Sequence, residues 1–263
     1  MEHYPLTEPR EEVSGTGCHT IEPPVESRFE VCCVRTPENE MSILKNMIVG
    51  GLFPKGRETA ACSDNDLTKC VRPYRLNVGC GRNTKEGWIN LDSAALPGVN
   101  IVCDLDDLRD TPIDLPDNTA EYFLLSHVIE HIRDSLGLMQ ELWRIAMPGA
   151  IAEVRVPHGG SDDAWEDPTH VRPYFSGSFG YFSQPFYWRA DYGYRADWQP
   201  NKIQLHVDKS RCAGLSPEEI LTKVQIERNI VREMVCELHA VKPMREPRRE
   251  LQSPKQIEII LVE

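Results

Sequence analysis

The residues best suited to chemistry lie in one stretch, LNVGCGRNTKEGWINLD at 76–92. An apolar run leads into Gly79-Cys80-Gly81, where small residues allow a sharp turn and a close approach of the backbone to a ligand. A second apolar segment then ends at Asp92, a carboxylate placed to accept hydrogen bonds from ribose hydroxyls. This pattern predicts a nucleotide-type ligand, with these candidate contacts: Asn77, Gly79, Cys80, Gly81 and Asp92.

A second candidate region is PHGGSDDAWEDPTHVRPYF at 157–175. Its histidines, His158 and His170, titrate near neutral pH and suit a general base. We favour His158, which follows a predicted strand directly. In the alternative interpretation of the DPTH segment, Asp167 caps the turn and the His170 imidazole bonds to backbone. Three further side chains are expected to face the substrate: Asp167, Arg172 as an anion handle, and Tyr174.

The segment His127-Val-Ile-Glu130-His131 fits the HxxEH zinc-protease signature, with two histidines four residues apart. Such a site needs a third ligand, and nothing in the sequence selects one. A divalent metal held by the acids and histidines of 157–175 lacks a fixed ligand spacing. We therefore expect no metal site and keep a zinc hydrolase at 127–131 as an alternative.

The elements that must position these residues alternate along the chain. Apolar residues at helical spacing predict a helix from Leu136 that Pro148-Gly149 ends. Strands separated by short loops and helices favour a mostly parallel sheet, whose ligands bind at the carboxyl ends of the strands. The predicted elements are strands at 74–79, 88–91, 100–103, 120–125, 151–156 and 202–207, a helix at 217–241, and a last strand in KQIEIILVE.

Two parts of the chain differ from this core. Residues 1–73 are broken by prolines and predict an extension that packs on the domain at 74–263, with a strand at 28–36 and a short helix at 41–53. A lid is the alternative. The segment at about 158–200 is rich in aromatic residues, and both a substrate-facing cover and a packed insertion account for it.

The stretch at 76–92 resembles the first motifs of class I S-adenosylmethionine-dependent methyltransferases, in a type-11-like branch where GWINLD directly follows the glycine turn. The resemblance continues in family order through IVCDL at 101–105, LPDNTAEYFLLSHVIEHI at 115–132, RIAMPGA at 144–150, AEVRVP at 152–157 and DPTHVRPYF at 167–175. It implies an α/β fold with a Rossmann-like, mostly parallel seven-stranded sheet, helices on both faces and an antiparallel last strand.

The same resemblance implies S-adenosyl-L-methionine as cofactor. Asp104 and Leu105 would flank its adenine ring. Ser126 and His127 are candidate contacts because they fall at the carboxyl end of the next predicted strand, where such sheets bind ligands. The implied activity is methyl transfer to O or N of a small-molecule or sugar-like acceptor. A binding or scaffold protein that keeps the cofactor fold without turnover is the alternative from another class.

Composition agrees with a soluble globular protein. The chain has 263 residues, 40% hydrophobic and 27% charged, as in globular proteins. Its net charge of −12 argues against nucleic-acid binding, because that depends on neutralising phosphates. No apolar run approaches the roughly 18 residues of a membrane span. Nine cysteines, an odd number, indicate reduced thiols and predict a cytoplasmic protein. The sequence leaves the oligomeric state open.

Overall fold

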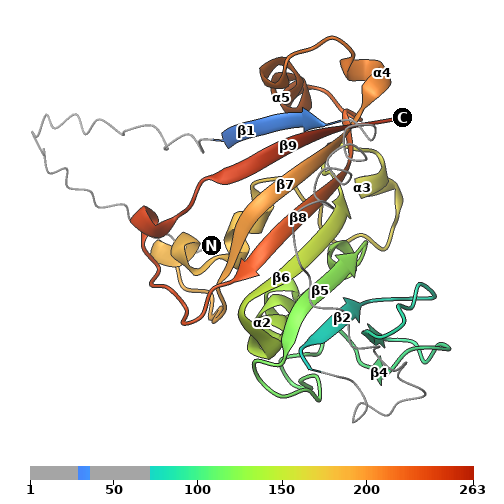
Figure 1. Cartoon of the computed structure of the whole chain (residues 1–263), viewed down its shortest axis with the longest axis vertical. Helices are drawn as coiled ribbons and strands as arrows, with labels where there is room; N and C mark the ends of the chain where they lie inside the picture. The colour runs from blue at the N-terminus through green and yellow to red at the C-terminus, as the bar shows by residue number, and fades with distance from the viewer. Residues whose placement is uncertain (1–28, 36–71) are drawn as a thin grey trace, which may run out of the picture.

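The computed structural model describes residues 29–35 and 72–263, which form one mixed sheet (Figure 1). Nine strands among these residues follow the order β1-β9-β7-β8-β6-β5-β2-β3-β4. The strands are β1 Phe29–Arg35, β2 Tyr74–Val78, β3 Ile89–Asp92, β4 Ile101–Val102, β5 Ala120–Ser126, β6 Ala146–Pro157, β7 Trp198–Asp208, β8 Val231–Ala240 and β9 Lys255–Val262. The α-helices are α2 Ser135–Ile145, α3 Asp163–Glu166, α4 Lys209–Cys212 and α5 Pro217–Ile226. Short 3-10 helices are η2 Ile129–His131, η3 Ser178–Phe182, η4 Gln184–Trp188 and η5 Arg249–Leu251.

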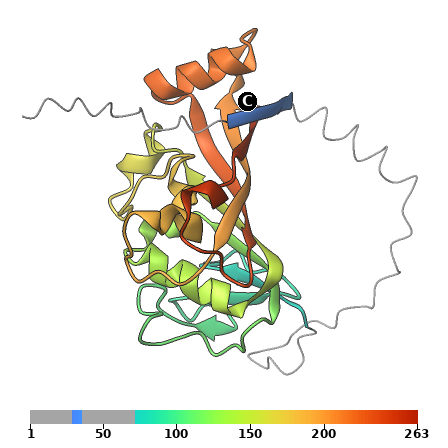
Figure 2. The same cartoon turned by 90° about the vertical axis from the view of Figure 1, so that its left-hand side faces the viewer.

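The central strands β2, β3, β4, β5 and β6 pair in parallel, as the sequence predicts. Side chains of a strand alternate between the two faces of the sheet. On one face Leu76, Phe123 and Val154 are fully buried. Figures 1 and 2 show α2, η3 and η4 against this face. The sheet is therefore held by one continuous apolar layer beneath these helices.

The other face of the central strands is polar. Glu153, Arg155 and Glu237 lie on it, half-buried, and Glu153 accepts hydrogen bonds from the Tyr122 hydroxyl at 2.5 Å and from Arg155 Nε at 2.7 Å. The expectation of seven strands is thus wrong for the described residues, in which nine strands form the sheet. The helices α2, η3 and η4 share one face, and the expectation of helices on both faces stays a prediction.

The prediction for the C-terminal third needs correction. The expected helix at 217–241 ends at Ile226, and Asn229 has a left-handed φ of 57°. β8 follows, because Met234, Cys236 and Leu238 recur at a spacing of two and all three are fully buried. β8 pairs antiparallel with both β6 and β7. The last strand, β9, instead runs parallel to its neighbours β7 and β1, so the antiparallel strand of the sheet is β8.

The helix α2 connects β5 to β6. Asp134 caps its first turn by accepting a hydrogen bond from Gly137 N at 2.9 Å. The helix ends at Ile145, and β6 begins at the next residue, Ala146, before the Pro148-Gly149 pair that was expected to end it. Gly149 has a φ of 77°, a conformation that suits glycine.

The predicted strand at 28–36 is confirmed as β1, at the end of the sheet beside β9. Residues before position 74 therefore add a strand to the sheet instead of only packing on it. The helix expected at 41–53 lies outside the described residues.

The aromatic segment is largely a packed insertion. Phe179, Tyr194 and Trp198 are buried, and the Trp198 indole packs edge-on against Phe123 of β5 and donates to Met139 O of α2 at 2.8 Å. Trp165 and Tyr181 remain about 60% exposed. Most rings of this segment thus stabilise the fold by covering the sheet beside α2.

Two further expectations concern the state of the cysteines and the absence of a membrane span. Within 72–263 the four cysteines, at positions 80, 103, 212 and 236, are free thiols. A helix both long and apolar enough to span a bilayer is not found among the described residues.

Candidate functional site

The residues predicted to bind the cofactor gather at one edge of the sheet. Gly79, Asp92 and Ser126 lie at or just after the ends of β2, β3 and β5, and Asp104 follows β4. Because these strands pair in parallel, their carboxyl ends share this edge. The structure thus places these four candidates at the edge that the sequence predicts for them, and their contact with a cofactor stays a prediction.

The two glycines of the turn serve different purposes. Both have a left-handed φ, 63° at Gly79 and 52° at Gly81. A Cβ on Gly79 would lie 2.6 Å from Val128 Cγ2, so this glycine is required by packing inside the protein. A Cβ on Gly81 would meet no atom within 4 Å. Both glycines are therefore required by their backbone conformation, and open space that a cofactor could fill lies beside Gly81.

Asp92 is tied to the glycine turn by its side chain. Oδ2 accepts a hydrogen bond from Gly81 N at 2.7 Å, and Oδ1 accepts one from Ala94 N at 3.0 Å. A carboxylate offers about four lone-pair positions, so about two remain for ribose hydroxyls. Asp92 therefore both fixes the turn and keeps the acceptor capacity expected of a ribose ligand.

A buried pair of asparagines holds the loop after the glycine turn. The Asn77 amide donates to Asn83 O at 2.9 Å and to Asn90 Oδ1 at 3.0 Å. Asn90 Oδ1 also accepts from Lys85 N at 2.8 Å. These bonds show Asn77 as a support of the loop, and its contact with the cofactor stays a prediction. Asn90 lies in the GWINLD motif, but its role was not anticipated.

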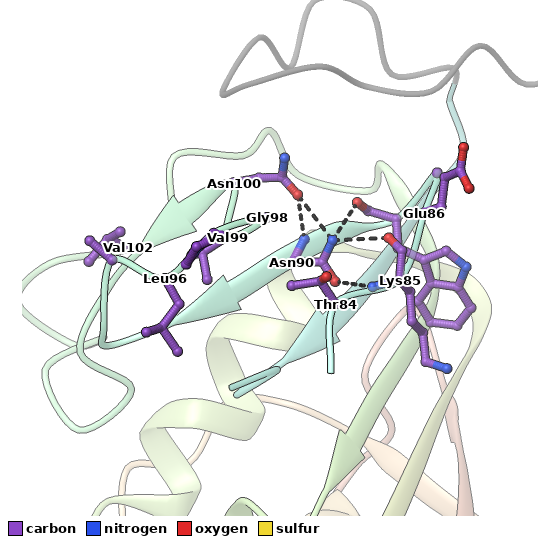
Figure 3. Close-up of a pocket in the computed structure, with 13 residues that line it drawn as sticks. Thr84, Lys85, Glu86, Asn90, Leu96, Gly98, Val99, Asn100 and Val102 are labelled. Atoms are coloured by element: carbon purple, nitrogen blue, oxygen red, sulfur yellow. Dashed lines mark hydrogen bonds between the residues drawn. The ribbon is translucent and has the colours of Figure 1, made fainter. Parts of the chain in front are cut away.

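A cavity of about 670 Å³ lies beside this loop (Figure 3). It is formed between residues 84–90 and 95–102, with the Asn90 amide bonded across it to Asn100 Oδ1 at 3.3 Å. Gly79, Gly81 and Asp92 do not line it. The cavity is therefore separate from the predicted cofactor edge.

The two residues expected beside the adenine ring behave differently. Asp104 is exposed, and its Oδ1 accepts from Asp106 N at 2.9 Å, which is the local turn bond of a loop carboxylate. Leu105 is buried in the core. Their contact with adenine stays a prediction.

His127 occupies a strained position directly after β5. Its φ is 54°, which is uncommon for a residue with a side chain and occurs preferentially at functional sites. Nδ1 lies 3.5 Å from Glu130 Oε1, and Nε2 lies 3.0 Å from Glu233 Oε1. The two carboxylates raise the pKa of His127 to about 9, so the imidazole is a cation at neutral pH.

These contacts contradict the HxxEH zinc arrangement. That motif needs His127 and His131 on one face of an α-helix, but residues 129–131 form a single 3-10 turn. His127 is instead bonded to Glu233 of β8. A zinc hydrolase built on His127 and His131 is therefore not carried forward.

His158, the favoured base, is buried. Its Nδ1 accepts a hydrogen bond from Gly160 N at 3.0 Å, and its ring packs edge-on against Phe175. Nδ1 is therefore a used acceptor, and Nε2 carries the hydrogen of the neutral ring. Burial also lowers the pKa of His158 to about 4. An imidazole whose lone pair already accepts a hydrogen bond cannot take a proton from the substrate that is to be methylated. The structure therefore does not support His158 as the base.

The pKa of His158 has a consequence for stability. In the unfolded chain its pKa is about 6.5, so unfolding takes up a proton between pH 6.5 and about 4. We expect the free energy of unfolding to fall as the pH falls through this range, by roughly 3 kcal/mol at most, and this contribution to be complete above pH 6.5. Urea denaturation at a series of pH values measures it. His158→Gln should flatten that part of the profile. An unchanged profile in His158→Gln would contradict the assignment.

The DPTH segment forms a local turn. Asp167 Oδ1 accepts from Thr169 N at 2.8 Å and from Thr169 Oγ1 at 2.6 Å, and His170 Nδ1 lies 3.2 Å from Ala164 O. This is the alternative in which Asp167 caps the turn and His170 bonds to backbone. These bonds use one oxygen of Asp167 and one nitrogen of His170, and the second nitrogen of the ring remains available.

The two other substrate candidates also make internal contacts. Arg172 Nη1 donates to Ser135 Oγ at 2.9 Å, at the first residue of α2. Tyr174 is buried, and its hydroxyl donates to Ile129 O at 3.4 Å. Burial raises the pKa of Tyr174 to about 12. Tyr174 is therefore a core residue that supports η2, and a substrate contact by its side chain is not supported.

Comparisons with known proteins give structural likenesses only. No family model and no curated protein matches the chain. A S-adenosylmethionine-dependent methyltransferase from Archaeoglobus fulgidus is 16% identical, with a TM-score of 0.47 over 77% of this chain and 93% of that one. A S-adenosylmethionine-dependent methyltransferase from Mesorhizobium loti is 12% identical, with a TM-score of 0.40 over 63% of this chain and 90% of that one. One from Aquifex aeolicus is 14% identical, with a TM-score of 0.36 over 64% of this chain and 82% of that one.

Proposed function

We propose that this chain transfers a methyl group from S-adenosyl-L-methionine to O or N of a small-molecule or sugar-like acceptor. The observation that carries the proposal is the hydrogen bond between Asp92 Oδ2 and Gly81 N at 2.7 Å. It joins an acidic strand end to a left-handed glycine turn with open space beside it. This combination is what a nucleoside bound at the carboxyl edge of a parallel sheet requires.

The order of the strands supports the same proposal. The strands β2, β3, β4, β5 and β6 are parallel, and β8 is the antiparallel strand inserted beside β6. The resemblance stated above implies a mostly parallel sheet with an antiparallel last strand, and here the antiparallel strand is β8, while the last strand, β9, is parallel to its neighbours. β7 completes this arrangement, and β9 and β1 extend it at one end.

The residues present fit the cofactor. The space beside Gly81 is free of protein atoms where a Cβ would stand, and Asp92 retains acceptor capacity for ribose hydroxyls. Bound there, the sulfonium would supply the methyl group for an in-line displacement. Gly81 would let the backbone approach the cofactor closely, and Asp92 would orient its ribose.

The acceptor would approach from the loops that follow β5 and β6. These loops hold His127, Glu130, His131 and His170, and Val171 N donates to Glu130 O at 2.8 Å to join them. A nucleophile held in line with the methyl carbon gains rate from positioning alone. Of the two histidines considered as a base, His170 is the one that we retain, through its second ring nitrogen.

The role of Asp92 is testable by cofactor binding. We expect Asp92→Ala to weaken the binding of S-adenosylhomocysteine by about 1.5–3 kcal/mol, because a hydrogen bond to a charged group is lost. Isothermal titration calorimetry measures this change. Asp106→Ala is a matched control, since its carboxylate lies on the next loop and accepts from Arg133 N at 2.7 Å.

Native affinity in a folded Asp92→Ala variant would contradict the assignment of the ribose ligand. A screen of methyl release with sugar and amine acceptors then separates an enzyme from a protein that only binds the cofactor. Cofactor binding without any methyl release across that screen would count against methyl transfer.

A further inference from the structure

Three side chains with metal-binding atoms converge where the loop after β5 meets the DPTH turn. One ligand atom each of Glu130, His131 and His170 lies within 4.8 Å of the other two. The two imidazole rings meet edge-on, with their centroids 4.7 Å apart. The loops are fixed to each other by the bond from Val171 N to Glu130 O. A backbone hydrogen bond thus holds the two loops of the cluster together.

Hydrogen bonds fix which nitrogen of His131 carries its hydrogen. Thr169 Oγ1 lies 2.6 Å from Asp167 Oδ1 and 2.9 Å from His131 Nδ1. An ionised carboxylate only accepts, so the single hydroxyl hydrogen of Thr169 goes to Asp167. Thr169 must then accept from His131, whose Nδ1 carries the hydrogen. The lone pair of the neutral His131 ring is therefore on Nε2.

The same reasoning applies to His170. Its Nδ1 lies 3.2 Å from Ala164 O, and a carbonyl oxygen only accepts. Nδ1 therefore carries the hydrogen, and Nε2 has the lone pair. Asp167 Oδ2 lies 3.9 Å from this Nε2 and adds negative charge nearby. Metal-binding histidines characteristically donate their other ring N–H to such a partner, which fixes the tautomer.

Glu130 supplies the independent observation. Its side chain is only 2% exposed, and neither carboxylate oxygen has a hydrogen-bond partner. The nearest cation among the described residues is His127, with Nδ1 at 3.5 Å from Oε1. A buried carboxylate without hydrogen bonds is costly unless a cation compensates it. His127 compensates the charge of Glu130, and an ion bound between Glu130 and the two imidazoles would supply the bonds that the carboxylate oxygens lack.

We propose that Glu130, His131 and His170 bind a divalent first-row transition-metal ion, with Zn²⁺ as the best-suited one. Two imidazole nitrogens and one carboxylate oxygen are a common ligand set for such ions. Ligand atoms at about 2.0–2.2 Å from the ion lie about 3.4 Å apart in tetrahedral geometry, so side-chain shifts of about 1 Å close the site. Three protein ligands leave at least one position for water or an oxygen or nitrogen of a ligand.

This site differs from the HxxEH arrangement considered above. It uses the glutamate and the second histidine of that motif but replaces His127 by His170 from the DPTH turn. It also revises the expectation of no metal, and it replaces the role of His170 as a base, because Nε2 of His170 cannot both bind an ion and take a proton. The proposal does not rest on methyl transfer, because binding of the ion needs neither cofactor nor acceptor.

The test is metal titration of the full-length, chelator-treated protein without an affinity tag. We expect one equivalent of Co²⁺ to bind with a visible absorption spectrum, and Zn²⁺ to displace it. His131→Ala and His170→Ala should each weaken Co²⁺ binding at least about 100-fold, since each removes a direct ligand. Thr169→Val should weaken it by about 10–100-fold through the lost support of His131. His239→Ala, a half-exposed histidine on β8, should bind as the native protein does.

Glu130→Gln provides a second line of evidence, because it is nearly isosteric and removes the charge. It should also lose the Co²⁺ spectrum while the circular dichroism spectrum remains native. Absence of a stoichiometric Co²⁺ spectrum in the native protein would overturn the proposal, and Glu130 would then be the counter-ion of His127 alone. Equal Co²⁺ affinity in the native protein, His131→Ala and His170→Ala would overturn it as well. S-adenosylhomocysteine affinity, measured on the same samples, reports separately on the proposed function.

Discussion

Gly81→Val should abolish the binding of S-adenosylhomocysteine while the fold remains. Gly81 has a φ of 52°, and a side chain there would extend into space that is free of protein atoms within 4 Å. The left-handed backbone costs the substituted protein about 1–2 kcal/mol of stability, which a folded domain tolerates. The side chain would occupy the volume that the cofactor needs. Calorimetric titration should therefore show no binding.

Gly149→Val is the matched control for this prediction. Gly149 also has a left-handed φ, of 77°, and also has open space around its Cβ position. It lies near the start of β6, at the opposite edge of the parallel strands. We expect both variants to lose a similar amount of melting temperature and only Gly81→Val to lose the ligand. If Gly81→Val binds S-adenosylhomocysteine normally, the cofactor lies elsewhere, and the proposal that methyl transfer takes place at this edge of the sheet is wrong.

Asp197→Ala should destabilise the protein by about 3–5 kcal/mol, because it breaks a buried ion pair and leaves a charge unpaired. The Asp197 side chain is fully buried. Its carboxylate accepts from Arg245 Nε at 2.7 Å, from Arg245 Nη2 at 2.8 Å and from Gln184 N at 3.1 Å. These bonds join the segment before β7 to η4 and to the loop after β8. Urea denaturation measures the loss.

Asp191→Ala tests whether burial is the reason. Asp191 forms a comparable two-pronged pair with Arg195, at 2.7 and 2.8 Å, but both side chains are more than half exposed. Exposed pairs contribute little to stability, because water and ions screen their charges. Equal losses in Asp191→Ala and Asp197→Ala would contradict the explanation by burial.

The central part of the fold could be predicted from the sequence because its signals are local. β2, β3 and β5 are short, largely apolar runs that end at or just before a glycine, an acid or a serine, and their boundaries lie near those predicted. β6 ends near its predicted end but begins at Ala146, ahead of the predicted strand at 151–156. β8 was missed because a helix-like composition around Glu233 and Glu237 hides the alternation of Met234, Cys236 and Leu238. This segment forms a strand because it pairs antiparallel with β6 and β7. That pairing depends on residues far away in the sequence, so the segment's own residues do not predict it.

In the candidate site too, local contacts could be predicted from the sequence and contacts between distant segments could not. Gly81 and Asp92 could be predicted because they are separated by a single strand, and their contact follows from the turn between them. The cluster of Glu130, His131 and His170 could not, because it depends on how the DPTH turn packs against the loop after β5. The tautomers that favour a metal depend on Thr169 and on Ala164 O, which only the folded chain brings into contact.

The pairing of β1 with β9 has a consequence for how the sheet is completed. β1 is the first of the described strands to be synthesised, and its partner β9 is the last. Contacts between distant parts of a chain form slowly, because a long loop must close first. During synthesis on the ribosome, β1 would remain without its partner β9 while the core from β2 to β8 assembles. An unpaired strand is a template for association with other chains, so the period before β9 emerges is when this protein is most exposed to mispairing.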